Sequence, residues 1–288
     1  MTIAASDGAV IAVSSQVARG SVGNRAMVFA LERLGFTVWA VPTVILPHHP
    51  GHGPVEKTVP EENRFARLLE ALIQDGRAAD VAGIVSGYLA SPAQAEAVAE
   101  LVRSVKSARP DALYLCDPVI GDRSGLYVAA ELAAAIRDAL LPLADIATPN
   151  AFECAWLAGE GDAAEPDLAA LAKRLSPPAV LVTSAPAMLR GGIGNLLVGE
   201  GGALLFEHPA VATAAKGTGD LLAALLLGRR LQGKSWSEAA ELAISSVAEI
   251  VAGTARAGAD ELMLPALQTA FVRPRVRVDV RRLGSRTG

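Results

Sequence analysis

Short apolar runs alternate with longer stretches in which apolar residues recur at helical spacing. The runs that predict buried strands lie at residues 10–14, 36–41, 81–86, 112–116, 146–147 and 179–183. The stretches that predict helices lie at residues 25–34, 61–74, 91–108, 129–140, 151–158 and 167–175. This alternation predicts an α/β fold with a mostly parallel central sheet, right-handed crossovers and helices on both faces.

The last third of the chain has a different pattern. Residues 195–198 and 203–206 flank Gly201-Gly202 and predict a hairpin, and further helices are expected from Thr218, Ser237 and Asp260. Residues 273–286 carry six arginines among valines. An edge strand or a frayed basic terminus fits this segment, and we expect the second. The chain then forms one domain over residues 1–272, followed by a flexible tail at 273–288.

One segment has no regular pattern at all. Residues 42–60 contain five prolines and three histidines, which predicts a long loop that is functional or mobile. His48, His49 and His52 in this loop could indicate a metal site or a solvent-facing, substrate-covering loop. Since no second group of ligands accompanies them, we favour the covering loop.

Composition excludes several classes of protein. Of the 288 residues 51% are hydrophobic and 19% are charged, so a large core is expected. A formal net charge of −4 argues against nucleic-acid or anionic-membrane partners. Cys116 and Cys154 lie far apart and are expected to be buried thiols. The N-terminus lacks a signal-peptide pattern and no apolar run has transmembrane length, so we expect a cytoplasmic protein.

Polar residues follow five of the predicted strands directly. They are Ser15, Tyr88, Asp117, Asn150 and Thr183. Ligands of open parallel sheets bind at the carboxyl ends of the strands, which favours a common active site, although Ser, Asp and Asn are also frequent in ordinary turns.

A glycine-rich turn precedes the most apolar helix. It reads Ala214-Ala215-Lys216-Gly217-Thr218-Gly219-Asp220. Backbone N–H groups at a helix start can hold a phosphate, and the Asp220 carboxylate can deprotonate a hydroxyl in the same space. An ordinary glycine-rich loop with an aspartate near the helix start is the alternative. The chain lacks the P-loop motif GxxxxGK[ST], a GxGxxG after the first strand, and the GxSxG of serine hydrolases.

These motifs together resemble the ribokinase-like superfamily of ATP-dependent kinases, and within it the pyridoxal kinases. The resemblance covers the chain to about residue 270. Its motifs are Ser15-Gln16-Val17 with Gly20 and Gly23-Asn24-Arg25, Ser86-Gly87-Tyr88-Leu89, Asp117-Pro118-Val119-Ile120-Gly121-Asp122, Thr148-Pro149-Asn150-Ala151-Phe152-Glu153 and Gly217-Thr218-Gly219-Asp220.

The resemblance implies a role for each motif in transfer of the ATP γ-phosphoryl group to the 5′-hydroxymethyl group of pyridoxal. Asp220 would be the base, and the N–H groups of Gly217, Thr218 and Gly219 would hold the transferring phosphate. Asp117 and Glu153 would act through Mg²⁺ or its waters. The other implied residues fall into an ATP group, Thr148, Asn150 and Thr183, and a substrate group, Ser15, Val17, Leu46, Pro50, Tyr88 and Tyr127.

The resemblance also implies a homodimer and a possible monovalent cation, and it makes residues 42–60 and 121–127 the covering segments. Two positions depart from the family pattern: Gln16 stands where histidine is usual, and Pro50 replaces a hydroxyl-bearing residue and has no N–H to donate. The preference among pyridoxal, pyridoxine and pyridoxamine therefore stays open. A kinase for hydroxymethylpyrimidine or a sugar, and a non-catalytic B6 carrier, are the alternatives.

Overall fold

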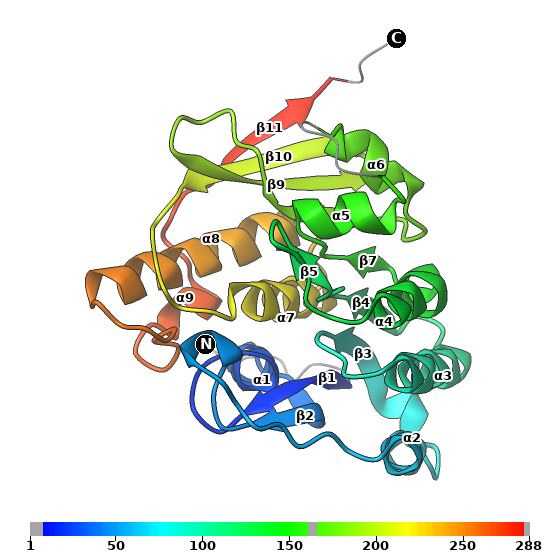
Figure 1. Ribbon diagram of the computed structural model, residues 1–288. Helices are drawn as coiled ribbons and strands as arrows, with labels where there is room; N and C mark the ends of the chain where they lie inside the picture. The colour runs from blue at the N-terminus through cyan, green and yellow to red at the C-terminus, as the bar shows by residue number, and fades with distance from the viewer. Residues whose placement is uncertain (1–7, 161–165, 285–288) are drawn as a thin grey trace.

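A nine-stranded sheet forms the centre of the molecule. The computed structural model describes residues 8–160 and 166–284. The strands lie in the order β11-β10-β9-β8-β7-β4-β3-β1-β2 (Figure 1). They are β1 (Ala9–Val17), β2 (Thr37–Leu46), β3 (Val81–Ser86), β4 (Leu113–Cys116), β7 (Ile146–Ala147), β8 (Val180–Ala185), β9 (Gly192–Gly199), β10 (Gly202–Pro209) and β11 (Asp279–Leu283). The strands from β2 to β8 pair in parallel, whereas β8, β9, β10 and β11 pair antiparallel with one another.

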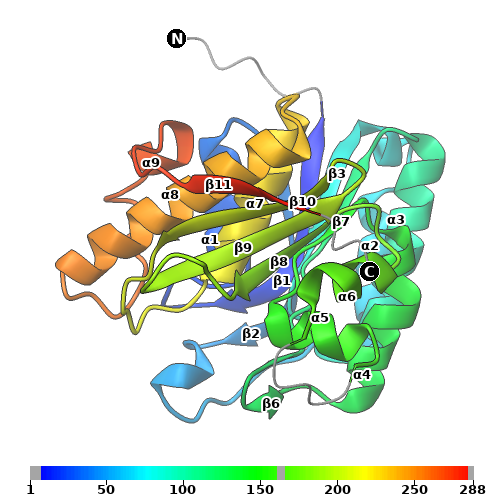
Figure 2. The same ribbon diagram turned by 90° about the horizontal axis from the view of Figure 1, so that it is seen from above.

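Helices cover both faces of this sheet, as Figure 2 shows from above. On one face lie α2 (Glu62–Leu72), α3 (Pro92–Ala108), α4 (Ala130–Ala135), α5 (Ala151–Leu157) and α6 (Leu168–Arg174). On the other lie α1 (Asn24–Arg33), α7 (Thr218–Leu231), α8 (Trp236–Arg256) and α9 (Thr269–Val272). Short helical turns are η1 (Pro50–His52), η2 (Arg77–Asp80), η3 (Ile136–Leu140) and η4 (Leu141–Leu143), and β5 (Gly121–Asp122) and β6 (Gly125–Leu126) form a small hairpin. The predicted α/β architecture is confirmed.

Alternation along β1 divides the core into two layers. Ile11 and Val13 belong to the apolar cluster under α2–α6, while Val10 and Ala12 belong to the cluster under α1, α7 and α8. Successive side chains of a strand point to opposite faces, so a strand that is apolar throughout is covered on both sides. Helix α7 is buried from Leu221 to Leu227, which explains its apolar sequence.

Most predicted elements form within a few residues of their expected ends. The hydroxyl of Ser91 accepts the N–H of Gln94 at 3.3 Å and caps α3, whose first residue is Pro92. Cys116 and Cys154 are both free and buried, as expected. In the described parts of the chain, no helix is long and apolar enough to cross a membrane.

Two loop boundaries were predicted wrongly. Strand β2 continues to Leu46, so residues 42–46 are not loop, and Pro42 is tolerated because β2 is the edge strand of the sheet. Strand β1 continues to Val17, which pairs with Leu46, so Ser15 lies inside the strand rather than after it. The register shifts between Ser14 and Gln16, next to Ser15.

The C-terminal segment also differs from expectation. No helix begins at Asp260: residues 260–263 are irregular, Pro265 disfavours a helical conformation at Leu264, and the short α9 follows. The tail is not a frayed end: β11 pairs with β10, and Arg281 lies 3.0 Å from the fully buried Glu207 carboxylate. The free edge of β10 and the need of the buried Glu207 carboxylate for a partner explain this pairing. Residues 285–288 lie outside the described residues.

Candidate active site

The start of α7 is a close-packed glycine turn. Gly217 has φ 95° and directly precedes the helix. A Cβ at this position would lie 2.2 Å from the backbone oxygen of Ser21, so only glycine fits. At Gly219 the nearest atom to such a Cβ is Asp117 Oδ2, 3.9 Å away. The free N–H groups of this turn and the positive end of the helix dipole provide a site for an anion.

Asp220 lies in the first turn of α7, beside this anion site. Its side chain accepts hydrogen bonds from the N–H of Gly23 and from its own N–H. Burial raises the pKa of Asp220 to about 6, although these two donors act in the opposite direction. A carboxylate with such a pKa is largely ionised at neutral pH and is suited to take a proton from a hydroxyl.

Two cavities meet at residues 217–220. The larger cavity has a volume of about 550 Å³ and reaches Gly217 and Asp220; the smaller has a volume of about 420 Å³ and reaches Thr218 and Gly219. Tyr127 lines both. Each volume suits a small organic molecule, and the turn stands between them.

The larger cavity brings together nearly all of the predicted substrate residues. Six of them line it: Ser15, Leu46, Pro50, Tyr88, Tyr127 and Asp220. Val17 does not; it is fully buried in a small apolar cluster with Val22, Val44 and Leu46 that supports the wall of the cavity. Gln16 is not in the lining either, and its side-chain amide lies 3.3 Å from the oxygen of Val17.

The smaller cavity has one polar and one apolar wall. Of the predicted nucleotide residues, Asn150, Thr183 and Gly219 line it, while Gly217 faces the larger cavity. The apolar wall comes mainly from α8, with Ile244, Val247, Ala248 and Val251. An elongated ligand with an apolar ring and a charged end fits this arrangement, with its charged end at the glycine turn.

Asp117, one of the two carboxylates predicted to act through a cation, lies close to the turn. Asp117 is buried, and its Oδ1 accepts the hydroxyl of Thr148 at 2.8 Å. Burial raises the pKa of Asp117 well above its ordinary value, and the negative charges of Glu153 and Asp220 act in the same direction. A bound cation would relieve this repulsion, so the Asp117 environment fits a divalent metal ion.

Glu153 is already satisfied by backbone donors. Its Oε1 accepts the N–H groups of Ile120 and Gly121 at 2.9 and 3.3 Å, and its Oε2 accepts that of Asn150 at 2.8 Å. Asn150 in turn caps α5 by accepting the N–H of Glu153, which forms a capping box. Burial raises the pKa of Glu153 to about 7. Within residues 8–160 and 166–284, no three His, Cys, Asp or Glu side chains form a ready-made metal site. Glu153 therefore fits a structural role, or contact with a cation through water, better than direct ligation.

Several lining residues were not predicted from the sequence. Lys216 and His49 both line the larger cavity. Lys216 lies inside the quoted glycine motif, and His49 lies in the predicted covering loop, so their positions in the sequence were the available signals. In the smaller cavity, Ser184 has φ 53° and sits where the register of β8 slips between Val182 and Ala185. A strained non-glycine residue of this kind often marks a functional site.

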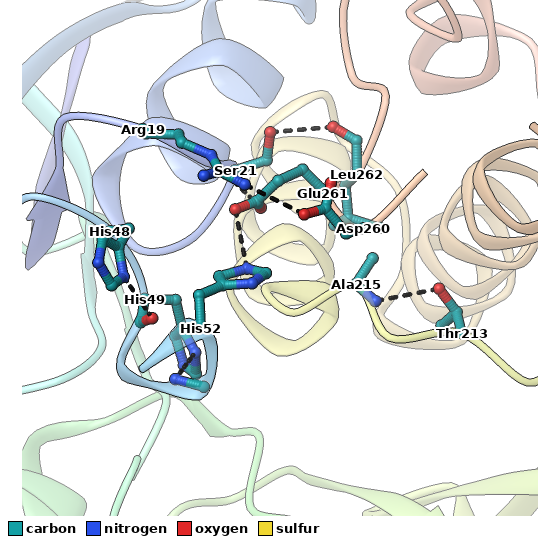
Figure 3. A network of polar contacts seen from close by, with 11 residues as sticks. Arg19, Ser21, His48, His49, His52, Thr213, Ala215, Asp260, Glu261 and Leu262 are labelled. Atoms are coloured by element: carbon teal, nitrogen blue, oxygen red, sulfur yellow. Dashed lines mark hydrogen bonds and ion pairs between the residues drawn. The ribbon is translucent and has the colours of Figure 1, made fainter. Parts of the chain in front are cut away.

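The segments expected to cover the site lie as predicted around the larger cavity. Turn η1 contributes Pro50, and the β5–β6 hairpin contributes Asp122. His49 accepts the N–H of Gly51 at 2.9 Å, and burial lowers the pKa of its imidazole. His52 is not among the lining residues; its imidazole points toward Glu261, as Figure 3 shows.

Comparison with known proteins places this geometry among kinases. The profile of the phosphomethylpyrimidine kinase family matches residues 20–264. The chain is 38% identical over 281 residues to "Pyridoxal kinase PdxY" of Rubrobacter xylanophilus, covering 95% of this chain and 97% of that protein. It is 42% identical over 265 residues to "Pyridoxine/pyridoxal/pyridoxamine kinase" of Bordetella bronchiseptica, covering 88% of this chain and 92% of that protein. The structure resembles pyridoxal kinase from Leishmania donovani in complex with ADP and pyridoxamine, with a TM-score of 0.86 and 28% identity over 96% of this chain and 100% of that one.

Proposed function

We propose that this chain, which belongs to the phosphomethylpyrimidine kinase family, is a pyridoxal kinase that transfers the γ-phosphoryl group of ATP to the 5′-hydroxymethyl group of pyridoxal. The observation that carries this proposal is the meeting of two cavities at one turn. Asp220 faces the larger cavity, and Gly219 faces the smaller one. An alcohol in the first and a nucleotide in the second would meet at this turn, in the arrangement that phosphoryl transfer requires.

Asp220 is the proposed general base. The hydroxymethyl group of the acceptor would lie within hydrogen-bond reach of its carboxylate, which takes the proton as the oxygen attacks phosphorus. The pKa of about 6 keeps this carboxylate ionised at neutral pH and still basic enough to accept a proton. The acceptor oxygen thus gives its proton to Asp220 as it forms the bond to phosphorus, so no second base is needed.

The glycine turn is the proposed anion hole. Negative charge develops on the oxygens of the transferring group, and the N–H groups of Gly217, Thr218 and Gly219 are fixed at the start of α7 before the substrate arrives. Because Ser21 abuts Gly217, these donors do not have to reorganise during the reaction.

Mg²⁺ is the proposed metal, held at Asp117 and, through its waters, near Glu153. When bound, it neutralises charge on the phosphates of the nucleotide. Asp117 Oδ2 faces the glycine turn, while Oδ1 is oriented by Thr148. Thr148 therefore holds the carboxylate in place, and Asn150 and Thr183 line the nucleotide side. We propose that a monovalent cation also binds at this site.

The pyridine ring of the acceptor would lie between Leu46, Tyr88 and Tyr127, with Ser15 as a hydrogen-bonding partner. The proline at position 50 removes a donor from the covering turn, and the neighbouring His49 offers an imidazole in the same cavity. All three B6 vitamers carry the same hydroxymethyl group, and they differ only at the ring substituent that this turn would cover.

We also propose that the protein acts in the cytoplasm as a homodimer. The basis is its family membership, and size-exclusion chromatography with light scattering tests the dimer.

The test of function is ADP release by the purified protein with Mg·ATP and, separately, pyridoxal, pyridoxine, pyridoxamine or hydroxymethylpyrimidine. Turnover with a B6 vitamer and formation of its 5′-phosphate is the expected result and ranks the three vitamers. Turnover with the pyrimidine alone would reassign the substrate. Tight binding of pyridoxal without ADP release would indicate a carrier.

A further inference from the structure

A network of polar contacts joins three distant segments beside the active site (Figure 3). His52, in the turn after β2, lies with Nε2 3.0 Å from Glu261 Oε1. The other carboxylate oxygen of Glu261, Oε2, accepts the N–H of Ser21 at 3.3 Å. One side chain thus contacts the covering turn and the loop after β1 with two separate oxygens.

Glu261 is well anchored on its own side. Its neighbours Leu262 and Leu264 are buried in the core under α7 and α8. The N–H of Met263 bonds to Thr254 of α8, and the hydroxyl of Ser21 bonds to the oxygen of Leu262 at 2.9 Å. Only 18% of the Glu261 side chain and 20% of that of His52 are exposed, so solvent competes weakly for both groups.

The loop that Glu261 contacts, residues 20–23, packs against the glycine turn and Asp220. Gly20 has φ 112°, and a Cβ there would lie 2.7 Å from Glu261 Oε1, so glycine lets the carboxylate approach the loop. The oxygen of Ser21 packs against Gly217, and the N–H of Gly23 bonds to Asp220. A displaced loop would therefore disturb both the glycine turn and the base.

The contact of Glu261 with His52 connects it to the wall of the larger cavity. His52 ends η1, whose first two residues, Pro50 and Gly51, line that cavity together with His49. Since the imidazole of His52 is bound to Glu261, the turn is held over the cavity from the outside.

We propose that Glu261 is a positioning residue that couples closure of the covering turn, through His52, to the loop that orients Asp220. The proposal rests on the proposed kinase function. It assigns two separable effects to one carboxylate: the His52 contact supports acceptor binding, and the Ser21 contact supports the chemical step.

The experiment is a double-mutant cycle with His52→Ala and Glu261→Ala, measured by steady-state kinetics with pyridoxal and Mg·ATP. His52→Ala should raise KM for pyridoxal about tenfold and leave kcat within about twofold. Glu261→Ala should raise KM similarly and also lower kcat about tenfold. In the double variant, loss of His52 should add nothing to KM, because its partner is already absent.

Two further variants complete the design. Asp260→Asn is the matched control, because the neighbouring Asp260 forms an exposed ion pair with Arg19 at 3.1 Å, and it should behave as wild type. Glu261→Gln should retain most of the wild-type activity, since the amide oxygen can accept the N–H of Ser21 and the amide N–H group can contact the His52 imidazole. Circular dichroism and melting curves show which variants are folded.

Each outcome of these experiments either supports or overturns the proposal. An unchanged KM in His52→Ala overturns the proposal, and it does so even if Glu261→Ala fails to fold, because His52 lies on a surface turn. Effects on KM that multiply in the double variant also overturn it. A wild-type protein without turnover on any B6 vitamer overturns the proposed function and this inference with it, whereas wild-type turnover with unaffected variants overturns the inference alone.

Discussion

The backbone oxygen of Ser21 occupies the space where Gly217 would carry a side chain, 2.2 Å from an ideal Cβ. These residues lie almost 200 positions apart in the sequence, and their contact joins the loop after β1 to the start of α7. It packs the loop that donates the Gly23 N–H to Asp220 directly against the turn that forms the proposed anion hole. The geometry of the proposed reaction depends on this contact as much as on the charged residues.

Gly217→Ala should therefore remove both activity and stability. The new methyl group would overlap the backbone oxygen of Ser21, and alanine would have to adopt the φ of 95° that Gly217 has. We expect a loss of at least about 2 kcal/mol in the free energy of unfolding and of about 100-fold in kcat. Urea unfolding and steady-state kinetics measure both.

Gly233→Ala is the matched control for this prediction. Gly233 also has a positive φ, 86°, but a Cβ there meets no atom within 4 Å. The free energy of unfolding of this variant should fall by about 1 kcal/mol, the cost of a positive φ at alanine, and its kcat should not change. Equal losses in the two variants would contradict the role given to the Ser21 contact.

Asp220→Asn should nearly abolish phosphorylation. The amide keeps the size of the side chain and can still accept from Gly23, but it cannot take a proton. We expect a fall of about 10³-fold in kcat and a change of less than about threefold in ATP affinity. Isothermal titration with a non-hydrolysable ATP analogue measures the second quantity. Loss of nucleotide binding, or retained turnover, would contradict the assignment of Asp220 as base.

The activity should fall on the acid side of neutrality. A base acts in its ionised form, and the pKa of Asp220 is about 6, so kcat/KM should rise with pH through this value. Glu153, with a pKa of about 7, extends the rise toward pH 7 if its charge supports the cation. Rates measured from pH 5 to pH 8 in buffers of constant ionic strength check this. A flat profile between pH 5 and 7 would contradict it.

Thr148→Val should weaken the response to Mg²⁺. Valine has nearly the same shape but removes the hydroxyl that donates to Asp117 at 2.8 Å. The pKa of this buried carboxyl then rises further, and its neutral form attracts a cation less. We expect the free Mg²⁺ concentration for half-maximal activity to increase about tenfold. Thr148→Ser restores the donor and should resemble wild type; equal Mg²⁺ curves for the valine and serine variants would argue against this role.

Arg281→Ala should destabilise the protein although the residue lies near the C-terminus. Its guanidinium lies 3.0 Å from Glu207, whose side chain is fully buried. Without this partner the Glu207 carboxylate keeps the N–H of Leu189, at 2.7 Å, but loses its counter-ion. We expect a loss of about 2 kcal/mol in the free energy of unfolding. Arg282→Ala, which removes an exposed hydrogen bond to Gly201, should cost less than about 1 kcal/mol, and similar losses would contradict the ion-pair explanation.

Much of the architecture was predictable because it depends on local patterns. The strand at 81–86 and the helix opened by Ser91-Pro92 form as expected, since burial and capping act over a few residues. The predicted polar residues Asn150 and Thr183 do meet, and their strand ends are linked by a β-bridge. Parallel topology brings strand ends together whatever the loops contain.

Other features depend on partners that the local pattern does not reveal. The edge position of β2 explains why Pro42 fits into a strand, and the buried Glu207 explains why an arginine-rich tail joins the sheet. Val17 belongs to the Ser15-Gln16-Val17 motif, yet its side chain packs behind the wall of the cavity.

The sequence by itself determined the fold class, the glycine turn before α7 and several polar residues at the ends of the predicted strands. Periodicity and short motifs encode these, because they follow from hydrogen bonding and burial within one element. The tertiary structure alone decided that the oxygen of Ser21 fills the space beside Gly217, and that Glu261 reaches both His52 and Ser21. Such contacts join segments more than 190 residues apart, and they are set by how the elements pack, which no local pattern of residues specifies.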